Sequence, residues 1–139
     1  MSKITLETNW AEGMRFETEI NGHKLILDAA EDNGGTNQGP RPKALMLAAL
    51  AGCTGMDVIS ILKKMRVDVT DFSIEIEANQ TEEHPKHYDA MKVIYKFKGN
   101  NLDMEKLQKA VSLSEERYCG VSAVYKKAMP VTFEVRIEN

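Results

Sequence analysis

The sequence has only two cysteines among its 139 residues, and it has few aromatic residues and no excess of positive charge. Two cysteines cannot form the dense disulfide framework of a small secreted protein, so we expect them to be reduced, redox-active or metal-binding. The net charge of −3 and the absence of a basic stripe argue against a nucleic-acid-binding protein. The sequence therefore predicts neither a disulfide scaffold nor a nucleic-acid partner.

Targeting and membrane-spanning signals are also absent. Residues 1–10 lack the apolar core of a signal peptide, which predicts a cytoplasmic location. All residues from 44 to 51 are apolar, but two glycines and Asp57 interrupt the continuation of this run, and a central carboxylate disfavours membrane insertion. Because 139 residues suffice to bury a core, we expect one globular domain over residues 1–139 and no membrane partner.

Alternation of apolar and polar residues is the main pattern that is present, and it predicts six strands. They cover residues 3–10, 14–20, 24–29, 67–78, 91–97 and 131–137. Asn21-Gly22 joins the second and third strands with a strong hairpin signal, since both residues tolerate positive φ. Residues 31–42 are rich in Gly, Asn and Pro and therefore form a loop.

Two helical regions complete the pattern. Residues 43–66 are apolar on all sides in their first half, which is typical of a helix buried in a core. Residues 103–117 carry one apolar stripe, and Asn101 or Asp103 can cap this helix. Near Gly120 we expect a break, followed by a short helix. The class is α+β, with antiparallel sheets packed on a long, central, buried helix.

The two cysteines, Cys53 and Cys119, fit two interpretations. Free cysteines are usually small, buried apolar residues. Alternatively, one thiol attacks a peroxide and the other resolves the product, which requires them to meet in space but not in sequence. A thiolate is the required nucleophile, and burial disfavours it, so a cation must lower the pKa of the attacking thiol from its usual value of about 8.5.

Long motifs surround both cysteines and resemble a known family. GPRPKALMLAALAGCTGMDVISILKKM and SLSEERYCGVSAVYKKAMPVTFEV, with WAEGMRFETEINGH and HPKHYDAMKVIYKFKG, are similar to the OsmC/Ohr family of thiol-dependent hydroperoxide reductases, closest to its YhfA-like branch. The resemblance covers nearly the whole chain. It implies an intertwined homodimer in which the cysteine-bearing helices share a core and two sites lie at the interface.

The resemblance also implies a reaction. Cys53 would attack an organic hydroperoxide and become a sulfenic acid, Cys119 would condense with it to a disulfide, and an external thiol or dithiol would reduce the pair. No cofactor is expected. His84 and His87 complete a nominal zinc set with the cysteines, but Cys53 lies in mid-helix without a second ligand nearby, so no metal is expected either.

Activation of the thiol is the point at which the chain departs from the family. Arg15 matches the family's activating arginine, and Arg41, in the loop before the central helix, is a competing candidate. The glutamate that holds the arginine in the family is replaced by Lys43 and Ala44. Asp57, four residues after Cys53 on the same helix face, could take the orienting role if it pairs with Arg15.

The missing glutamate keeps a second class of function open. In this alternative the fold is a non-enzymatic module that binds a small apolar ligand at the dimer interface, and its cysteines are passive.

Overall fold

The structure, a computed structural model, describes all residues from Met1 to Asn139. It divides into two compact units, Met1–Met46 and Leu47–Asn139, which are described in turn. The expectation of one domain therefore stays a prediction.

The first unit is built on a three-stranded antiparallel sheet of order β1-β2-β3. Its strands are β1 (Thr8–Glu12), β2 (Arg15–Ile20) and β3 (His23–Leu27). Asn21 and Gly22 both have positive φ, 52° and 83°, so the predicted hairpin is confirmed.

One strand boundary in this unit was predicted wrongly. The alternation over residues 3–10 predicted a strand from residue 3, but β1 begins at Thr8 and residues 1–7 are exposed. Alternation describes which side chains could face a core, whereas a strand also needs a partner for its backbone hydrogen bonds, and the β1–β2 ladder begins at the Thr8–Thr18 pair. The loop after β3 contains a short 3₁₀ helix, η1 (Glu31–Asn33).

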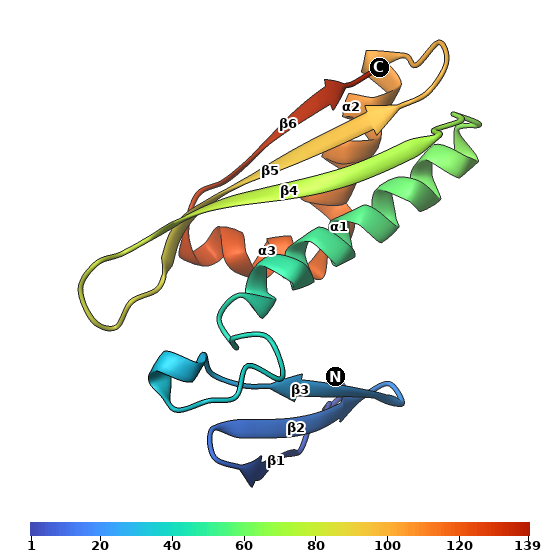
Figure 1. The fold of residues 1–139 in the computed structure, drawn as a ribbon. Helices are drawn as coiled ribbons and strands as arrows, with labels where there is room; N and C mark the ends of the chain where they lie inside the picture. The colour runs from blue at the N-terminus through green and yellow to red at the C-terminus, as the bar shows by residue number, and fades with distance from the viewer. The chain divides into compact units, whose positions relative to one another are not determined.

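The second unit packs helices on one side of a second three-stranded sheet, of order β4-β5-β6 (Figure 1). Its elements are α1 (Leu45–Lys64, whose first two residues belong to the first unit), β4 (Asp71–Gln80), β5 (Tyr88–Lys98), α2 (Met104–Leu113), the π-helix η2 (Ser114–Tyr118), α3 (Gly120–Ala128) and β6 (Val131–Ile137). The predicted α+β class, with two small sheets and three α-helices, is confirmed.

The prediction that both sheets are antiparallel is wrong for one pair of strands. β4 and β5 are antiparallel, but β6 pairs with β5 in parallel, from Met91–Val131 to Phe97–Ile137. The segment between β5 and β6 contains α2, η2 and α3. This helical crossover returns the chain to the end of the sheet at which β5 begins, as parallel pairing requires.

β4 also begins later than predicted, at Asp71 instead of residue 67. The end of α1 uses the intervening residues: Arg66 has a left-handed φ of 59°, and the Val67 N–H donates to the Leu62 carbonyl over 3.0 Å. This turn satisfies a helix-terminal carbonyl that would otherwise lack a partner.

Only one face of α1 is buried within the chain, so burial of its other face in a shared dimer core stays a prediction. The buried residues recur every fourth position: Leu50, Thr54, Val58 and Leu62. Gly55 brings the helix close to the sheet, because a Cβ there would lie 3.0 Å from Ile74 Cδ1. On the opposite face Met56 is 77% exposed, so an apolar surface is left uncovered.

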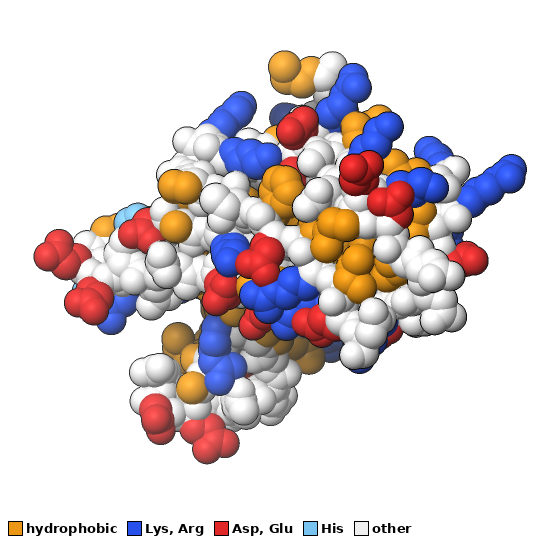
Figure 2. Space-filling view, turned by 90° about the horizontal axis from the view of Figure 1, so that it is seen from above, with side chains coloured by type: hydrophobic (Ala, Val, Ile, Leu, Met, Phe, Trp, Pro, Cys, Tyr) orange, Lys and Arg blue, Asp and Glu red, His pale blue; other side chains and the backbone are white.

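By length and hydropathy alone, α1 also qualifies as a candidate membrane span, with a mean hydropathy of 1.9 and 22% of its apolar window buried. Its buried face, however, is hydrogen-bonded to the sheet, since Thr54 Oγ1 lies 2.6 Å from the Tyr95 hydroxyl. This is the behaviour of a core helix. Lysine and arginine side chains are intermixed with acidic ones over the face drawn in Figure 2, as expected for a chain without a basic stripe.

The helical region before β6 breaks near the predicted place. Asp103 caps α2, accepting from the Glu105 N–H over 2.9 Å. The helix then widens into the π-helix η2 and stops at Cys119, whose backbone is extended (φ −78°, ψ 104°). Cys119 is at the same time the N-cap of α3, so the break places a cysteine between two helices.

Candidate functional site

Cys53 and Asp57 lie one turn apart on α1 and project from the same face, as their spacing predicted. Cys119 reaches the same place from the junction between η2 and α3. Its Sγ accepts from the Ser122 N–H over 3.3 Å, which fixes the thiol against the first turn of α3. The two sulfur atoms and an Asp57 carboxylate oxygen all lie within 4.8 Å of one another.

The two thiols have different surroundings. Cys53 is half-buried, whereas Cys119 is only 3% exposed. Burial raises the pKa of Cys119 to about 11; the Ser122 N–H opposes this shift, and the hydrogen bond with Cys53 adds to it. Cys119 is therefore a neutral thiol near pH 7, and Cys53 is the more accessible sulfur.

Two sulfurs and a carboxylate are donors that Zn²⁺ accepts, but a structural zinc site uses four protein ligands. No fourth histidine, cysteine, aspartate or glutamate joins the three. His87 Nδ1 lies 2.8 Å from the Pro85 carbonyl, within its own turn. The three side chains thus lack the fourth ligand of a structural zinc site, and the expectation that no metal is bound stays a prediction.

A chain of buried hydroxyls continues from Asp57 into the core. Ser114 Oγ lies 3.1 Å from Asp57 Oδ2 and 2.8 Å from Thr54 Oγ1. Thr54 Oγ1 is in turn 2.6 Å from the Tyr95 hydroxyl, and Thr54, Tyr95 and Ser114 are fully buried. This hydroxyl chain therefore links side chains of α1, β5 and η2.

The far end of this chain is Glu115, a buried carboxylate. The Tyr95 hydroxyl donates to Glu115 Oε1 over 2.6 Å, and Ser122 Oγ donates to Oε2 over 2.9 Å. Lys126 Nζ lies 3.5 Å from Oε2 and donates to the Glu115 carbonyl over 2.7 Å. Burial and the bond to Glu115 raise the pKa of Tyr95, so this hydroxyl stays protonated.

The sequence analysis did not identify these hydroxyls or Glu115. Polar residues near the cysteines were the available signal: Thr54 directly follows Cys53, and Ser114 and Glu115 lie five and four residues before Cys119. Glu115 also begins a run of charged residues, 115–117, a pattern typical of a solvated face, whereas its side chain is buried at 4% exposure.

Two cavities adjoin the site, one beside Cys119 and one beside Asp57. One of about 290 Å³ is lined by Cys119 and residues of η2 and α3, and one of about 130 Å³ is lined by Asp57, Ser60 and Lys64. Tyr118 lines both and is 59% exposed. Solvent-accessible space thus lies beside both the buried thiol and the carboxylate.

Arg15, in the first unit, is held by a side chain that the sequence analysis did not consider. Its Nη1 donates to Gln38 Oε1 over 2.8 Å, while its Nε is buried and has no hydrogen-bond partner. A buried N–H without an acceptor is unfavourable, so Arg15 Nε is an unsatisfied donor of the first unit.

Asp28 organises the loop that presents Gln38. Its carboxylate accepts from the N–H groups of Ala29, Thr36 and Gln38 and from the Thr36 hydroxyl. These bonds, that from Gln38 first, hold the pKa of Asp28 at about 2.

We expect Asp28→Asn to destabilise the protein, because an amide cannot accept all of these bonds. The pKa of Asp28 is lowered in the folded state, so its contribution is complete above about pH 5 and is lost as the pH falls toward 2. Thermal unfolding should show a difference from wild type that is largest near neutral pH and shrinks on acidification. Exposed Asp32→Asn is the control, and a difference independent of pH would contradict the assignment.

Arg41, the competing candidate, is bonded within its own loop. Its Nη1 donates to the Gly39 carbonyl over 2.9 Å and its Nη2 to Asn37 Oδ1 over 2.8 Å. Both contacts are those of a loop-stabilising residue. The choice between Arg15 and Arg41 as the activating cation stays a prediction.

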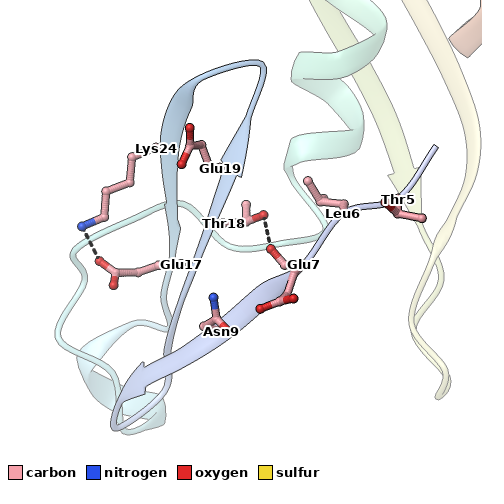
Figure 3. A pocket seen from close by; sticks show the side chains of 8 residues that line it. All are labelled: Thr5, Leu6, Glu7, Asn9, Glu17, Thr18, Glu19 and Lys24. Atoms are coloured by element: carbon pink, nitrogen blue, oxygen red, sulfur yellow. Dashed lines mark hydrogen bonds and ion pairs between the residues drawn. The ribbon is translucent and has the colours of Figure 1, made fainter.

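The first unit also contains a cavity of about 420 Å³ on its sheet (Figure 3). Its labelled side chains include the Lys24–Glu17 ion pair and Thr18, which donates to the Glu7 carbonyl. It contains no cysteine or histidine. The nucleophiles of the chain lie in the second unit instead.

Fold and site together define an α+β protein with a reduced, unequal cysteine pair. The family model described as OsmC-like protein matches residues 35–134. Protein YhfA of Escherichia coli K12 is 33% identical over 129 residues, covering 92% of this chain and 93% of its own. The chain belongs to the OsmC-like family, as the sequence motifs predicted.

Solved structures agree with this assignment. A hypothetical protein from Aquifex aeolicus VF5 is 29% identical with a TM-score of 0.82, each chain being covered completely. The organic hydroperoxide resistance protein OhrB of Bacillus subtilis has a TM-score of 0.66 at 19% identity, covering 95% of this chain and 98% of its own. The second similarity supports the fold alone.

Proposed function

We propose that this protein is a thiol peroxidase that reduces organic hydroperoxides through Cys53 and Cys119. The observation that carries the proposal is the pairing of a half-buried thiol with a buried, neutral one within 4.8 Å. Membership of the OsmC-like family supports it, as do structural relatives described as organic hydroperoxide resistance proteins, one of them OsmC from Legionella pneumophila.

The two thiols divide the reaction. The Cys53 thiolate attacks the terminal peroxide oxygen, the O–O bond breaks, and Cys53 becomes a sulfenic acid while the alkoxide leaves as an alcohol. Cys119 then attacks the Cys53 sulfur, a disulfide forms, and water leaves. An external thiol or dithiol reduces the disulfide, which suits the reducing cytoplasm.

The test is direct. One equivalent of t-butyl or cumene hydroperoxide added to the reduced protein should give an intramolecular Cys53–Cys119 disulfide and one equivalent of alcohol. Peptide mass spectrometry after alkylation detects the bond, and hydrogen peroxide serves as the comparison oxidant. If Cys53 remains a free thiol under these conditions, the protein is not a thiol peroxidase.

We further propose that the protein is an intertwined homodimer whose interface covers the exposed side of α1. A groove of about 490 Å³ runs along this side, lined by Ala51, Gly52, Gly55, Met56, Ile59, Phe72, Ser73 and Ile74. Its lining is mostly apolar, and burying such a surface against a second copy is favourable by the hydrophobic effect.

Sedimentation at micromolar concentration should therefore give about twice the chain mass of 15.6 kDa. Met56→Asp should shift the protein toward monomer, since it would bury a charge in the interface. Val124→Asp is the control, because Val124 is similarly exposed, at 64% against 77%, but lies on α3 outside the groove. A wild-type monomer at this concentration would contradict the shared core.

The same groove favours one alternative function, a non-enzymatic module that binds a small apolar ligand. Two results together would support this alternative over the peroxidase. The amount of a fluorescent fatty acid bound would rise with the fraction of protein that is dimeric, and the Cys53 thiol would not react with hydroperoxides.

A further inference from the structure

The hydroxyl chain between Asp57 and Glu115 has more contacts than hydrogens. Four contacts link its members: Asp57–Ser114, Ser114–Thr54, Thr54–Tyr95 and Tyr95–Glu115. Each hydroxyl has one hydrogen to donate, and an ionised carboxylate has none. Three hydroxyls thus supply three hydrogens for four contacts.

With both carboxylates ionised, one oxygen pair would be in contact without a hydrogen between them. Tyr95 would donate to Glu115 and Ser114 to Asp57, which leaves a single Thr54 hydrogen for contacts of 2.6 and 2.8 Å. Two lone pairs facing each other at such a distance, fully buried, are unfavourable. One added proton on an end carboxylate removes this conflict.

The two ends differ in their ability to hold this proton. Glu115 has a cation, Lys126 Nζ at 3.5 Å, and a second hydroxyl, Ser122, on its Oε2, both of which favour its ionised form. Within residues 47–139, Asp57 has no ion-pair partner. Cys53 Sγ and Cys119 Sγ lie within 4.8 Å of its carboxylate, and Lys64 and Tyr118 line the cavity beside it. The added proton therefore belongs on Asp57.

We propose that, in the reduced protein, Asp57 is a neutral acid that donates to Ser114, and that it supplies the proton for the leaving alkoxide. Every contact is then satisfied in one direction, from Asp57 through Ser114, Thr54 and Tyr95 to Glu115. The second half of this proposal rests on the proposed peroxidase function; the first half does not.

Proton balance over the cycle is closed. As the Cys53 thiolate displaces the alkoxide, Asp57 gives it a proton and becomes a carboxylate, and the Ser114 hydroxyl turns its hydrogen to Asp57 Oδ2. This carboxylate then takes the proton of Cys119, which attacks the sulfenic acid, and the departing hydroxide takes the proton back and leaves as water. Reduction by the dithiol releases two protons, one to Cys119 and one to Asp57.

A neutral Asp57 also removes a conflict at the thiol. An ionised carboxylate within 4.8 Å of Cys53 Sγ would disfavour the thiolate. Neutral Asp57 does not oppose the activated nucleophile, and it becomes charged only after the nucleophile has reacted.

Infrared spectroscopy of the reduced protein in D₂O near neutral pH locates the proton without any substrate. We expect a carboxylic acid carbonyl band that Asp57→Asn removes. Tyr95→Phe should also remove it, because two hydroxyls then serve the remaining contacts from Thr54 to Asp57 without an added proton. Tyr88→Phe and Asp89→Asn should keep the band, because these residues lie in β5 with Tyr95 but are not part of the hydroxyl chain. Circular dichroism checks that each variant is folded.

The pH dependence of Cys53 alkylation gives a second readout. If Asp57 is neutral, Asp57→Asn leaves the midpoint of alkylation unchanged; if it is ionised, the variant alkylates at clearly lower pH. Single-turnover oxidation by t-butyl hydroperoxide should nevertheless slow about tenfold or more in Asp57→Asn, as expected for a lost proton donor.

The outcomes separate the two proposals. Absence of the band in wild type, or a lower alkylation midpoint in Asp57→Asn, overturns the proton assignment whether or not the protein is a peroxidase. An active wild type with an equally fast Asp57→Asn overturns the proton delivery. A wild type that shows the band but does not react with hydroperoxide refutes the peroxidase function and leaves the proton on Asp57 supported.

Discussion

Replacing Cys53 with serine is expected to reduce hydroperoxide consumption to the uncatalysed rate, the largest effect of any single substitution. A serine hydroxyl is not ionised near neutral pH and cannot replace a thiolate as nucleophile. Stopped-flow measurement of t-butyl hydroperoxide consumption with an external dithiol gives the rate.

The matched substitution at the second sulfur should have a different effect. Cys119→Ser is expected to consume one equivalent of hydroperoxide and then stop, with Cys53 trapped as a sulfenic acid or over-oxidised to a sulfinic acid. Mass spectrometry distinguishes these products. If Cys53→Ser stays active while Cys119→Ser is inert, the roles of the two cysteines are reversed, in conflict with the burial of Cys119 and its pKa of about 11.

The second large effect is expected for Arg15. A close guanidinium favours the charged form of an acid by about tenfold to a thousandfold, so Arg15→Ala should reduce the thiolate fraction of Cys53 and slow peroxide reduction about tenfold or more. Alkylation rates across pH and single-turnover kinetics report the two quantities.

Four further variants test the assignment of Arg15 as the activating cation. Arg41→Ala and Lys43→Ala should change the reaction much less, and Ala44→Glu should speed it by restoring the family's partner for the arginine. Gln38→Ala should have an intermediate effect, because Gln38 holds Arg15 by a single hydrogen bond. If Arg41→Ala is the slow variant instead, the loop before α1 supplies the cation; if neither arginine matters, activation by an arginine is wrong.

Local patterns were enough to predict the elements and the family. Alternation and helical periodicity depend on neighbouring residues, and the hairpin at Asn21-Gly22 depends on the φ angles that two residues tolerate, so both were read from the sequence. The i, i+4 spacing of Cys53 and Asp57 was sufficient to place them on one face of α1. The long motifs around the two cysteines identified the OsmC-like family.

Pairings between distant segments were decided only by the tertiary structure. The parallel pairing of β6 with β5 follows from the path of the crossover, which composition does not specify. The approach of Cys119 to Cys53 and the hydroxyl chain from Asp57 to Glu115 join residues that are up to 66 positions apart. A polar residue in a sequence pattern can be solvated or buried, and whether it needs a partner depends on the side chains that the fold brings against it.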